Sequence, residues 1–212
     1  MAVAYKAPAG PRFGVLRVGL TGGIASGKSM VGAYLSQLGV PTIDSDDVTH
    51  DLLRNDIELK AEIRKTFGDG VFASDGSVDR KKLGVVVFAD EVRRKQLEAL
   101  VHPRVRQKTD AFFKAHENDK LAVNIVPLLF EANLAGHYDS VWLVKATKKQ
   151  QVKRLRETRG MTRKEAEARL SSQMPLRQKL SLLKKLPSWA IINNSGTADE
   201  ARQQVSRLLA EI

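Results

Sequence analysis

The sequence predicts an α/β fold built on a doubly wound, mostly parallel β-sheet. Two observations lead to this prediction. Apolar runs of strand length alternate with stretches of helical spacing along the chain, which is the pattern of a parallel sheet covered by helices on both faces. The first apolar run, at 15–20, leads directly into a glycine-rich segment and then into a helical stretch. Ligands of such sheets bind at the carboxyl ends of the strands, so we expect the site there.

Length and composition limit the class of protein. The chain has 212 residues, which allows one sizeable α/β domain with a small insertion and is too short for two large domains. It has no cysteine, which excludes disulfides and thiolate metal sites. It has no uninterrupted run of 18 apolar residues and no secretory signal pattern. We therefore expect a cytoplasmic protein without membrane partners.

The positive charge is concentrated in one segment. Residues 145–185 contain 14 Lys or Arg and 3 Glu, so this segment accounts for the whole formal net charge of +11. A basic segment of this kind fits a nucleic-acid surface, and it fits equally well a lid that folds over a triphosphate. Charge alone does not decide between the two.

Residues 22–29 form a phosphate-binding loop, the name used below for this segment. They match G-x-x-x-x-G-K-[ST] without a break: Gly22, Gly23, Ile24, Ala25, Ser26, Gly27, Lys28 and Ser29. A loop between a strand and a helix points backbone N–H groups and the positive end of the helix dipole at one small volume. We expect it to bind ATP, with Lys28 reaching the β- and γ-phosphates and the Ser29 hydroxyl holding Mg²⁺.

The remaining elements follow from apolar spacing and turn residues. We expect an N-terminal arm at 1–14 and one domain at 15–212, with a core at 15–47, 118–147 and 186–212, a helical acceptor subdomain at 48–117 and a basic lid at about 148–185. Further strands are expected at 40–43, 121–126, 140–144 and 190–193, and further helices at 29–38, 148–159, 163–173 and 199–212.

Two carboxylates follow the second expected strand of the core. Asp44 and Asp46 are two residues apart, so an extended segment would point both to the same side. One would bind Mg²⁺, directly or through water, and the other would accept the proton of an acceptor hydroxyl. The structural alternative is that Asp44 or Asp47 only caps a helix that starts near Val48.

Other candidates are less specific. The strand at 121–126 ends in Pro127 rather than in the aspartate of a Walker-B strand, and no N-K-x-D element occurs, which argues against a signalling GTPase. His102 precedes a proline and is either a helix-end or packed histidine or a group that contacts substrate. Glu131 follows an apolar strand end and is either a helix cap or an acceptor-binding residue.

Five strings occur in an order that resembles the dephospho-CoA kinase family. They are VGLTGGI (18–24), TIDSD (42–46), HP (102–103), VPLLFE (126–131) and SQMP (172–175). The resemblance covers roughly residue 15 to the C-terminus. It implies transfer of the ATP γ-phosphate to the ribose 3′-hydroxyl of dephospho-CoA. It also implies a P-loop NTPase fold similar to nucleoside monophosphate kinases, with a five-stranded parallel core, a helical CoA domain and a lid.

The resemblance also implies roles for residues. Residues 25–30, ending in Met30, and Asn194 match ATP-binding positions, Asp46 matches the proposed general base, and Asp44 matches its partner. Arg154 matches a lid arginine. The next expected lid arginine falls on Thr158, and Arg159 lies one place later, so we expect Arg154 and Arg159 to close over the transferred phosphate.

The sequence departs from the family pattern at one place, and two other functions are compatible with it. PSWA at 187–190 replaces the Ala-Asp that the family pattern usually has there. The rivals are a kinase for another small alcohol or nucleotide and a nucleic-acid-binding ATPase. The chain lacks the clustered aromatic residues on which single-stranded nucleic acids stack, so we do not expect a nucleic-acid partner.

Overall fold

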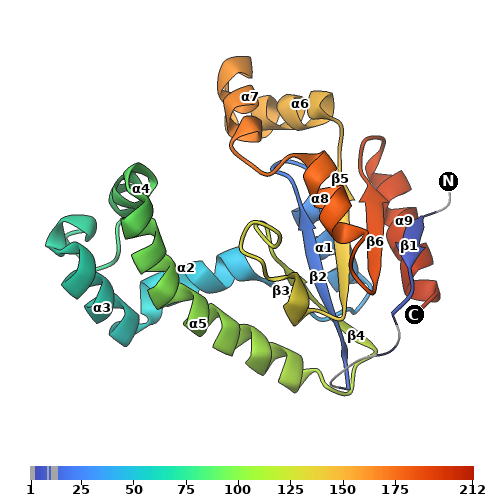
Figure 1. Cartoon of the computed structure of the whole chain (residues 1–212), viewed down its shortest axis with the longest axis horizontal. Coiled ribbons are helices and arrows are strands. Elements are labelled where there is room, and N and C mark those ends of the chain that lie inside the picture. The colour runs from blue at the N-terminus through green and yellow to red at the C-terminus, as the bar shows by residue number, and fades with distance from the viewer. Residues whose placement is uncertain (1–2, 9, 11–13) are drawn as a thin grey trace. The chain divides into compact units, whose positions relative to one another are not determined.

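The computed structural model describes residues 3–8, 10 and 14–212. The chain divides into two compact units: Met1–Ile43 together with Ala115–Ile212, and Asp44–Lys114. The first unit contains a mixed sheet with helices on its faces, and the second is helical (Figure 1).

Six strands form one sheet in the order β1-β6-β5-β2-β4-β3. The strands are β1 (Ala4–Lys6), β2 (Leu16–Gly22), β3 (Thr42–Asp44), β4 (Leu121–Ile125), β5 (Ser140–Lys145) and β6 (Trp189–Asn193). The pairs β2–β4, β2–β5 and β5–β6 are parallel. The predicted α/β class with a mostly parallel sheet is confirmed, and the five expected strands are all present.

The sixth strand, β1, corrects the expectation of an arm without regular structure at 1–14. It pairs antiparallel with β6, with Ala4 opposite Ile191, and the Ser188 hydroxyl donates a hydrogen bond to the Lys6 carbonyl at 3.1 Å. All three residues of β1 are exposed, so no apolar alternation marked them as a strand. Residues 1–2, 9 and 11–13 of the expected arm lie outside the described residues.

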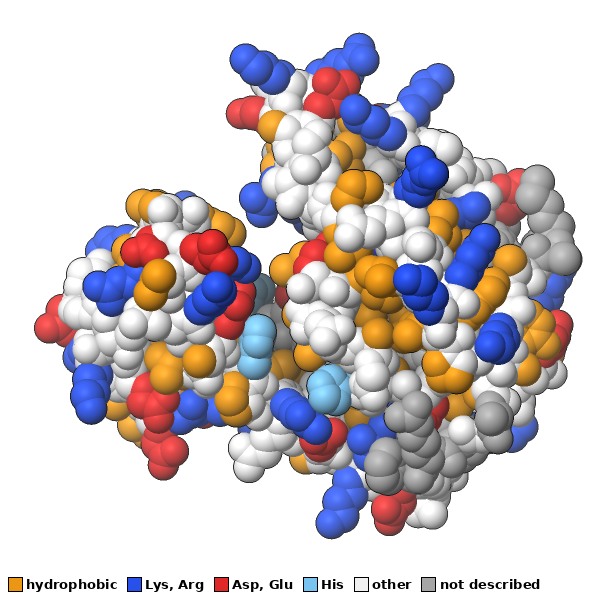
Figure 2. Space-filling view, in the orientation of Figure 1, with side chains coloured by type: hydrophobic (Ala, Val, Ile, Leu, Met, Phe, Trp, Pro, Cys, Tyr) orange, Lys and Arg blue, Asp and Glu red, His pale blue; other side chains and the backbone are white. Residues whose placement is uncertain are grey.

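The basic helices begin and end at residues that the sequence marks clearly. In α6 (Lys148–Arg159) the Thr147 hydroxyl caps the first turn, and Gly160 ends the helix with φ of 63°. In α7 (Arg163–Ser171) Thr162 and Glu165 form a reciprocal capping box. Figure 2 shows Lys and Arg side chains gathered over these two helices.

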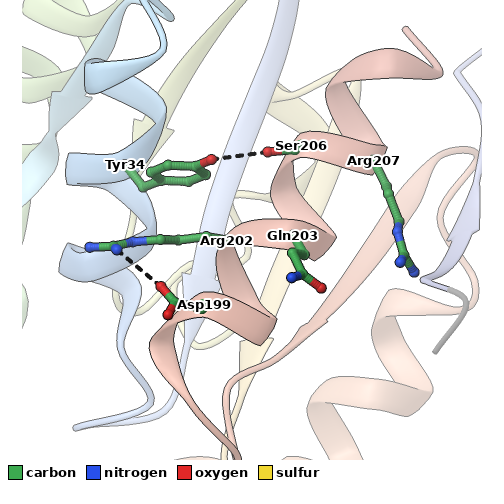
Figure 3. Close-up of a pocket in the computed structure, with 6 residues that line it drawn as sticks. All are labelled: Tyr34, Asp199, Arg202, Gln203, Ser206 and Arg207. Carbon is green, nitrogen blue, oxygen red and sulfur yellow. Dashed lines mark hydrogen bonds and ion pairs between the residues drawn. The ribbon is translucent and has the colours of Figure 1, made fainter.

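The core of the first unit lies between the sheet and two helices, α1 (Lys28–Gln37) and α9 (Ala198–Ala210). Its buried members include Val18, Leu35, Trp142, Ile192 and Val205. Polar contacts join the two helices at their surface, where the Tyr34 hydroxyl lies 3.0 Å from the Ser206 hydroxyl and the Arg202 guanidinium lies 5.6 Å from the Tyr34 ring centroid (Figure 3). These contacts fasten α9 to α1.

A further helix, α8 (Leu176–Leu183), was not expected. It lies in front of β5 in Figure 1 and contacts that strand. Its buried residues are Lys179 and Leu183. Its leucines at 176, 180 and 183 have helical spacing, but 8 residues cover only about two turns, too few for this spacing to mark a separate helix within the basic segment.

The second unit contains α2 (Ser45–Asn55), α3 (Ile57–Phe67), α4 (Arg80–Ala89) and most of α5 (Glu91–Ala115), with a 3₁₀ turn at Asp69–Val71. It has an apolar core of its own, formed by residues such as Leu52, Leu59, Ile63, Leu83 and Val101. The stretch at 48–117 is helical, as the spacing predicts. Among the described residues, no helix of either unit is long and apolar enough to span a membrane.

Candidate active site

The phosphate-binding loop joins β2 to α1, as its sequence pattern requires. Gly27 has φ of 101°, and a Cβ there would lie 1.9 Å from the Asn194 amide nitrogen. A Cβ on Gly22 would lie 2.3 Å from the Val144 carbonyl oxygen. Both glycines are therefore needed, because a side chain at either position would collide with Asn194 or with the Val144 carbonyl. The N–H groups of the loop lie at the start of α1.

The side chain of Lys28 folds back on the loop. Its Nζ donates hydrogen bonds to the carbonyl oxygens of Gly22 at 2.9 Å and Gly23 at 3.0 Å. The next residue, Ser29, is exposed in the first turn of α1, and Met30 packs against the core below. An ammonium group and an exposed hydroxyl therefore lie at the end of the loop where a polyphosphate and its metal ion would bind.

Two glutamines hold the Ile24 peptide from both sides. The Gln151 side chain on α6 donates to the Ile24 carbonyl at 2.7 Å. The Ile24 N–H donates to the Gln173 side-chain oxygen at 2.7 Å. Sequence reasoning assigned no role to either glutamine, because the partners are 127 and 149 residues apart along the chain.

Arg154 and Asn194 hold the next part of the loop. The Arg154 guanidinium donates to the carbonyl oxygens of Ala25 and Ser26, each at 3.2 Å, and to that of Asn194 at 2.9 Å. The Asn194 amide donates to the Ser26 carbonyl at 2.8 Å. The structure therefore brings both predicted residues to the phosphate-binding loop, where they contact its backbone. Arg159 is exposed near the end of α6.

The acidic segment differs from the expected geometry. Asp44 ends β3 and caps α2, and its side chain accepts a hydrogen bond from the Asp46 N–H at 2.8 Å. The helix starts at Ser45 rather than near Val48, so Asp46 and Asp47 lie in its first turn. The expectation of an extended segment with Asp44 and Asp46 on one side is wrong, because the Asp44 cap starts the helix three residues early.

Electrostatics distinguish Asp44 from its neighbours. Partial burial raises the pKa of the Asp44 carboxyl above its usual value, and the nearby Asp46 and Asp47 carboxylates raise it further. The hydrogen bond from the Asp46 N–H acts in the opposite direction. Asp46 and Asp47 themselves are exposed. Three carboxylates therefore lie at one helix start, and the two neighbours favour the neutral form of the Asp44 carboxyl.

Glu131 and His102 occupy different settings. Glu131 lies in a turn that starts no helix, so the helix-cap interpretation is wrong. Its carboxylate instead pairs with the Lys179 ammonium of α8 at 2.8 Å. His102 lies in the middle of α5 and is exposed, so it is neither a helix-end nor a packed histidine.

Comparisons with known proteins identify the family of this chain. A family model for dephospho-CoA kinase matches residues 16–200. The chain is 41% identical over 198 residues to the dephospho-CoA kinase of Shouchella clausii, covering 92% of this chain and 98% of that protein. The chain belongs to the dephospho-CoA kinase family.

Further relatives extend this result. The dephospho-CoA kinase of Geobacillus kaustophilus is also 41% identical, with 92% of this chain and 96% of that protein covered. A crystal structure from Thermus thermophilus superposes with a TM-score of 0.77 at 33% identity, covering 93% of this chain and 98% of the other. The dephospho-CoA kinase of Campylobacter jejuni superposes with a TM-score of 0.67 at 26% identity, covering 92% and 96%.

The departure at 187–190 has a structural role in this member of the dephospho-CoA kinase family. Ser188 is buried, and its hydroxyl donates to the Lys6 carbonyl at 3.1 Å and lies 2.8 Å from the Ser140 hydroxyl, which can donate to it. These bonds join β1, β5 and the segment before β6. The serine therefore stabilises the pairing of β1 at this edge of the sheet.

Proposed function

We propose that this chain transfers the γ-phosphate of ATP to the ribose 3′-hydroxyl of dephospho-CoA, which gives coenzyme A and ADP and completes coenzyme A biosynthesis. The observation that carries this conclusion is the family match over residues 16–200 on a chain whose phosphate-binding loop is fully formed. Phosphoryl transfer depends mainly on positioning and on cations that balance developing charge, and the loop supplies the first of these.

In this proposal the loop N–H groups and Lys28 bind the β- and γ-phosphates of ATP. Residues Gly22 to Met30 surround the phosphates, and Asn194 keeps the loop in shape through its bond to the Ser26 carbonyl. Lys28 is already beside the loop, held by two of its carbonyl groups. Arg154 and Arg159 of the lid contribute positive charge as the transferred group moves.

Magnesium is part of the proposal. The described residues contain no cluster of three or more His, Cys, Asp or Glu side chains that would hold a metal ion alone. Mg²⁺ keeps several waters and binds through one or two protein oxygens together with substrate phosphates. The Ser29 hydroxyl and the Asp44 carboxylate each offer an oxygen of this kind, and we assign both to Mg²⁺. The ion would neutralise charge on the phosphate oxygens.

Asp46 is the proposed general base. It is exposed in the first turn of α2, so its carboxylate is accessible to an acceptor. In this role it orients the 3′-hydroxyl and takes its proton as the phosphoryl group is transferred. We also propose that His102 and Glu131 contact the acceptor substrate. A cytoplasmic location, where ATP is available, also belongs to it.

A direct product analysis tests the function. The purified protein is incubated with ATP, Mg²⁺ and dephospho-CoA, and the product is examined by mass spectrometry with fragmentation of the ribose. The expected product carries one added phosphate on the 3′-oxygen. ATP hydrolysis that needs a polynucleotide and leaves dephospho-CoA unchanged would contradict the proposal and favour a nucleic-acid-dependent ATPase.

A further inference from the structure

A cavity of about 490 Å³ lies beside the phosphate-binding loop. Its wall includes Gly23 and Ser26 of the loop, the end of β5, Gln151 of α6 and the connection from α7 into α8. Three lysines line it (Lys145, Lys148 and Lys179), and none of its lining residues is acidic. A cavity with this lining favours an anionic occupant.

Lys179 is the most buried of these lysines. Its side chain is 1% exposed, although lysine is rarely buried unless it is paired. Its ammonium lies 2.8 Å from Glu131, whose side chain is 22% exposed. The direction of that contact does not meet hydrogen-bond geometry, and Nζ has no directed hydrogen bond within the described residues. The charge is therefore paired, and an ammonium with three N–H donors has donors beyond the one that faces Glu131.

A second polar atom on the same wall is also unsatisfied. Ser26 is 1% exposed, and its hydroxyl has no hydrogen-bond partner among the described residues. Buried polar groups without partners are rare in native proteins and call for an explanation such as a bound ligand. Two such groups that line one basic cavity point to an acceptor of hydrogen bonds that enters it.

We propose that Lys179 is a ligand of the γ-phosphoryl group of ATP and that Glu131 holds the Lys179 ammonium in position beside the phosphate-binding loop. This inference rests on the proposed function and adds a residue to it. Lys28 and Arg154 each bond loop carbonyl oxygens. Lys179 is the cavity-lining cation whose only recorded partner in the described residues is the Glu131 carboxylate. It donates to a γ-phosphoryl oxygen, and its charge offsets the charge that spreads over those oxygens during transfer.

A double replacement separates this role from a structural one. Lys179→Met alone leaves Glu131 without its partner and is expected to lower the Tm. Replacing a buried ion pair by apolar residues of similar size is often neutral or stabilising, so Lys179→Met with Glu131→Leu should restore the Tm. The kcat with dephospho-CoA should stay about 10²-fold below the parent in both variants, and Glu131→Leu alone, measured beside them, separates any loss that comes from the acceptor-side role of Glu131. Lys184→Met, an exposed neighbour after α8, is the matched control and should leave the kcat unchanged.

Nucleotide affinity gives a second measurement that does not depend on the acceptor. The dissociation constants of Mg·ADP and of the non-hydrolysable analogue Mg·AMP-PNP are measured by calorimetry for the parent and the double variant. Loss of a γ-phosphoryl ligand should weaken the analogue at least about tenfold and leave ADP affinity unchanged. A double variant that regains the parental kcat, or that keeps the parental preference for the analogue over ADP, would overturn the inference. A parent that makes no coenzyme A would refute the proposed function, and the affinities would still decide the role of Lys179.

Discussion

Asp46 and Asp47 are neighbours with the same exposure and the same helical turn, so they form a matched pair for testing the general base. Asp46→Asn should reduce kcat about 10²-fold or more with little change in the KM for dephospho-CoA, because the amide keeps the shape but does not accept a proton. Asp47→Asn should stay near the parental rate. Steady-state kinetics with both substrates varied measures this. The reverse order of effects would place the base at Asp47.

Asp44 should show a conflict between stability and activity. Because the folded state raises the pKa of this carboxyl, folding takes up a proton there, and the stability that it contributes falls as the pH rises above the usual value of 3.8. Asparagine also caps helices well and carries no charge. The Tm difference between Asp44→Asn and the parent should therefore become more positive between about pH 3 and pH 7.

The same substitution should lower activity. If Asp44 holds Mg²⁺, directly or through water, its loss should reduce kcat about tenfold or more. Thermal unfolding over the pH range and kinetics at saturating Mg²⁺ test the two halves of this prediction. If Asp44→Asn instead loses stability relative to the parent as the pH rises, the charged Asp44 carboxylate stabilises the fold. Repulsion from Asp46 and Asp47 then does not outweigh that stabilisation.

At the scale of elements, the contact between α6 and the phosphate-binding loop makes a separate prediction. Gln151→Leu removes the hydrogen bond to the Ile24 carbonyl and leaves Ile24 held only through its N–H, by Gln173. The KM for ATP should rise about fivefold, equivalent to about 1 kcal/mol for one hydrogen bond, while the Tm changes little. Gln178→Leu, exposed on α8, is the control. Equal KM values in the two variants would mean that the loop keeps its shape without Gln151.

Elements were predictable where the signal is local. The ends of α6 and the start of α7 follow from Thr147, Gly160 and Thr162, whose capping roles depend only on near neighbours. The strand β1 was missed because it is exposed and depends on pairing with β6, far along the chain. The start of α2 was misplaced because four consecutive residues, Asp44 to Asp47, are all of types that cap helices, and the sequence does not rank Asp44 above Asp47.

The same reasoning applies to the candidate site. The phosphate-binding loop was predictable because its chemistry comes from backbone groups and neighbouring residues in a fixed spacing. The roles of Gln151, Gln173 and Lys179 were not, since each contacts a partner that only the fold brings close. The only local signal for Lys179 was a lysine among the spaced leucines of a short helix, and such a pattern does not by itself indicate a ligand.

At the scale of the whole molecule, the helical unit of Asp44–Lys114 is the part of the chain proposed to bind the acceptor. Leu52, Leu53 and Val101 are buried in its core, and Leu97, Leu100 and Val105 pack against that core. These apolar residues therefore stabilise the unit itself. We predict that dephospho-CoA is preferred over a smaller nucleotide because binding energy along the pantetheine arm is used to place the ribose hydroxyl.

The central claim is that dephospho-CoA is the acceptor, and the ratio of two specificity constants tests it most directly. The kcat/KM values for dephospho-CoA and for AMP are measured with the same protein and the same Mg·ATP concentration. The account predicts that dephospho-CoA exceeds AMP by at least about 10²-fold, equivalent to about 2.7 kcal/mol of transition-state binding. Equal values, or a preference for AMP, would contradict it.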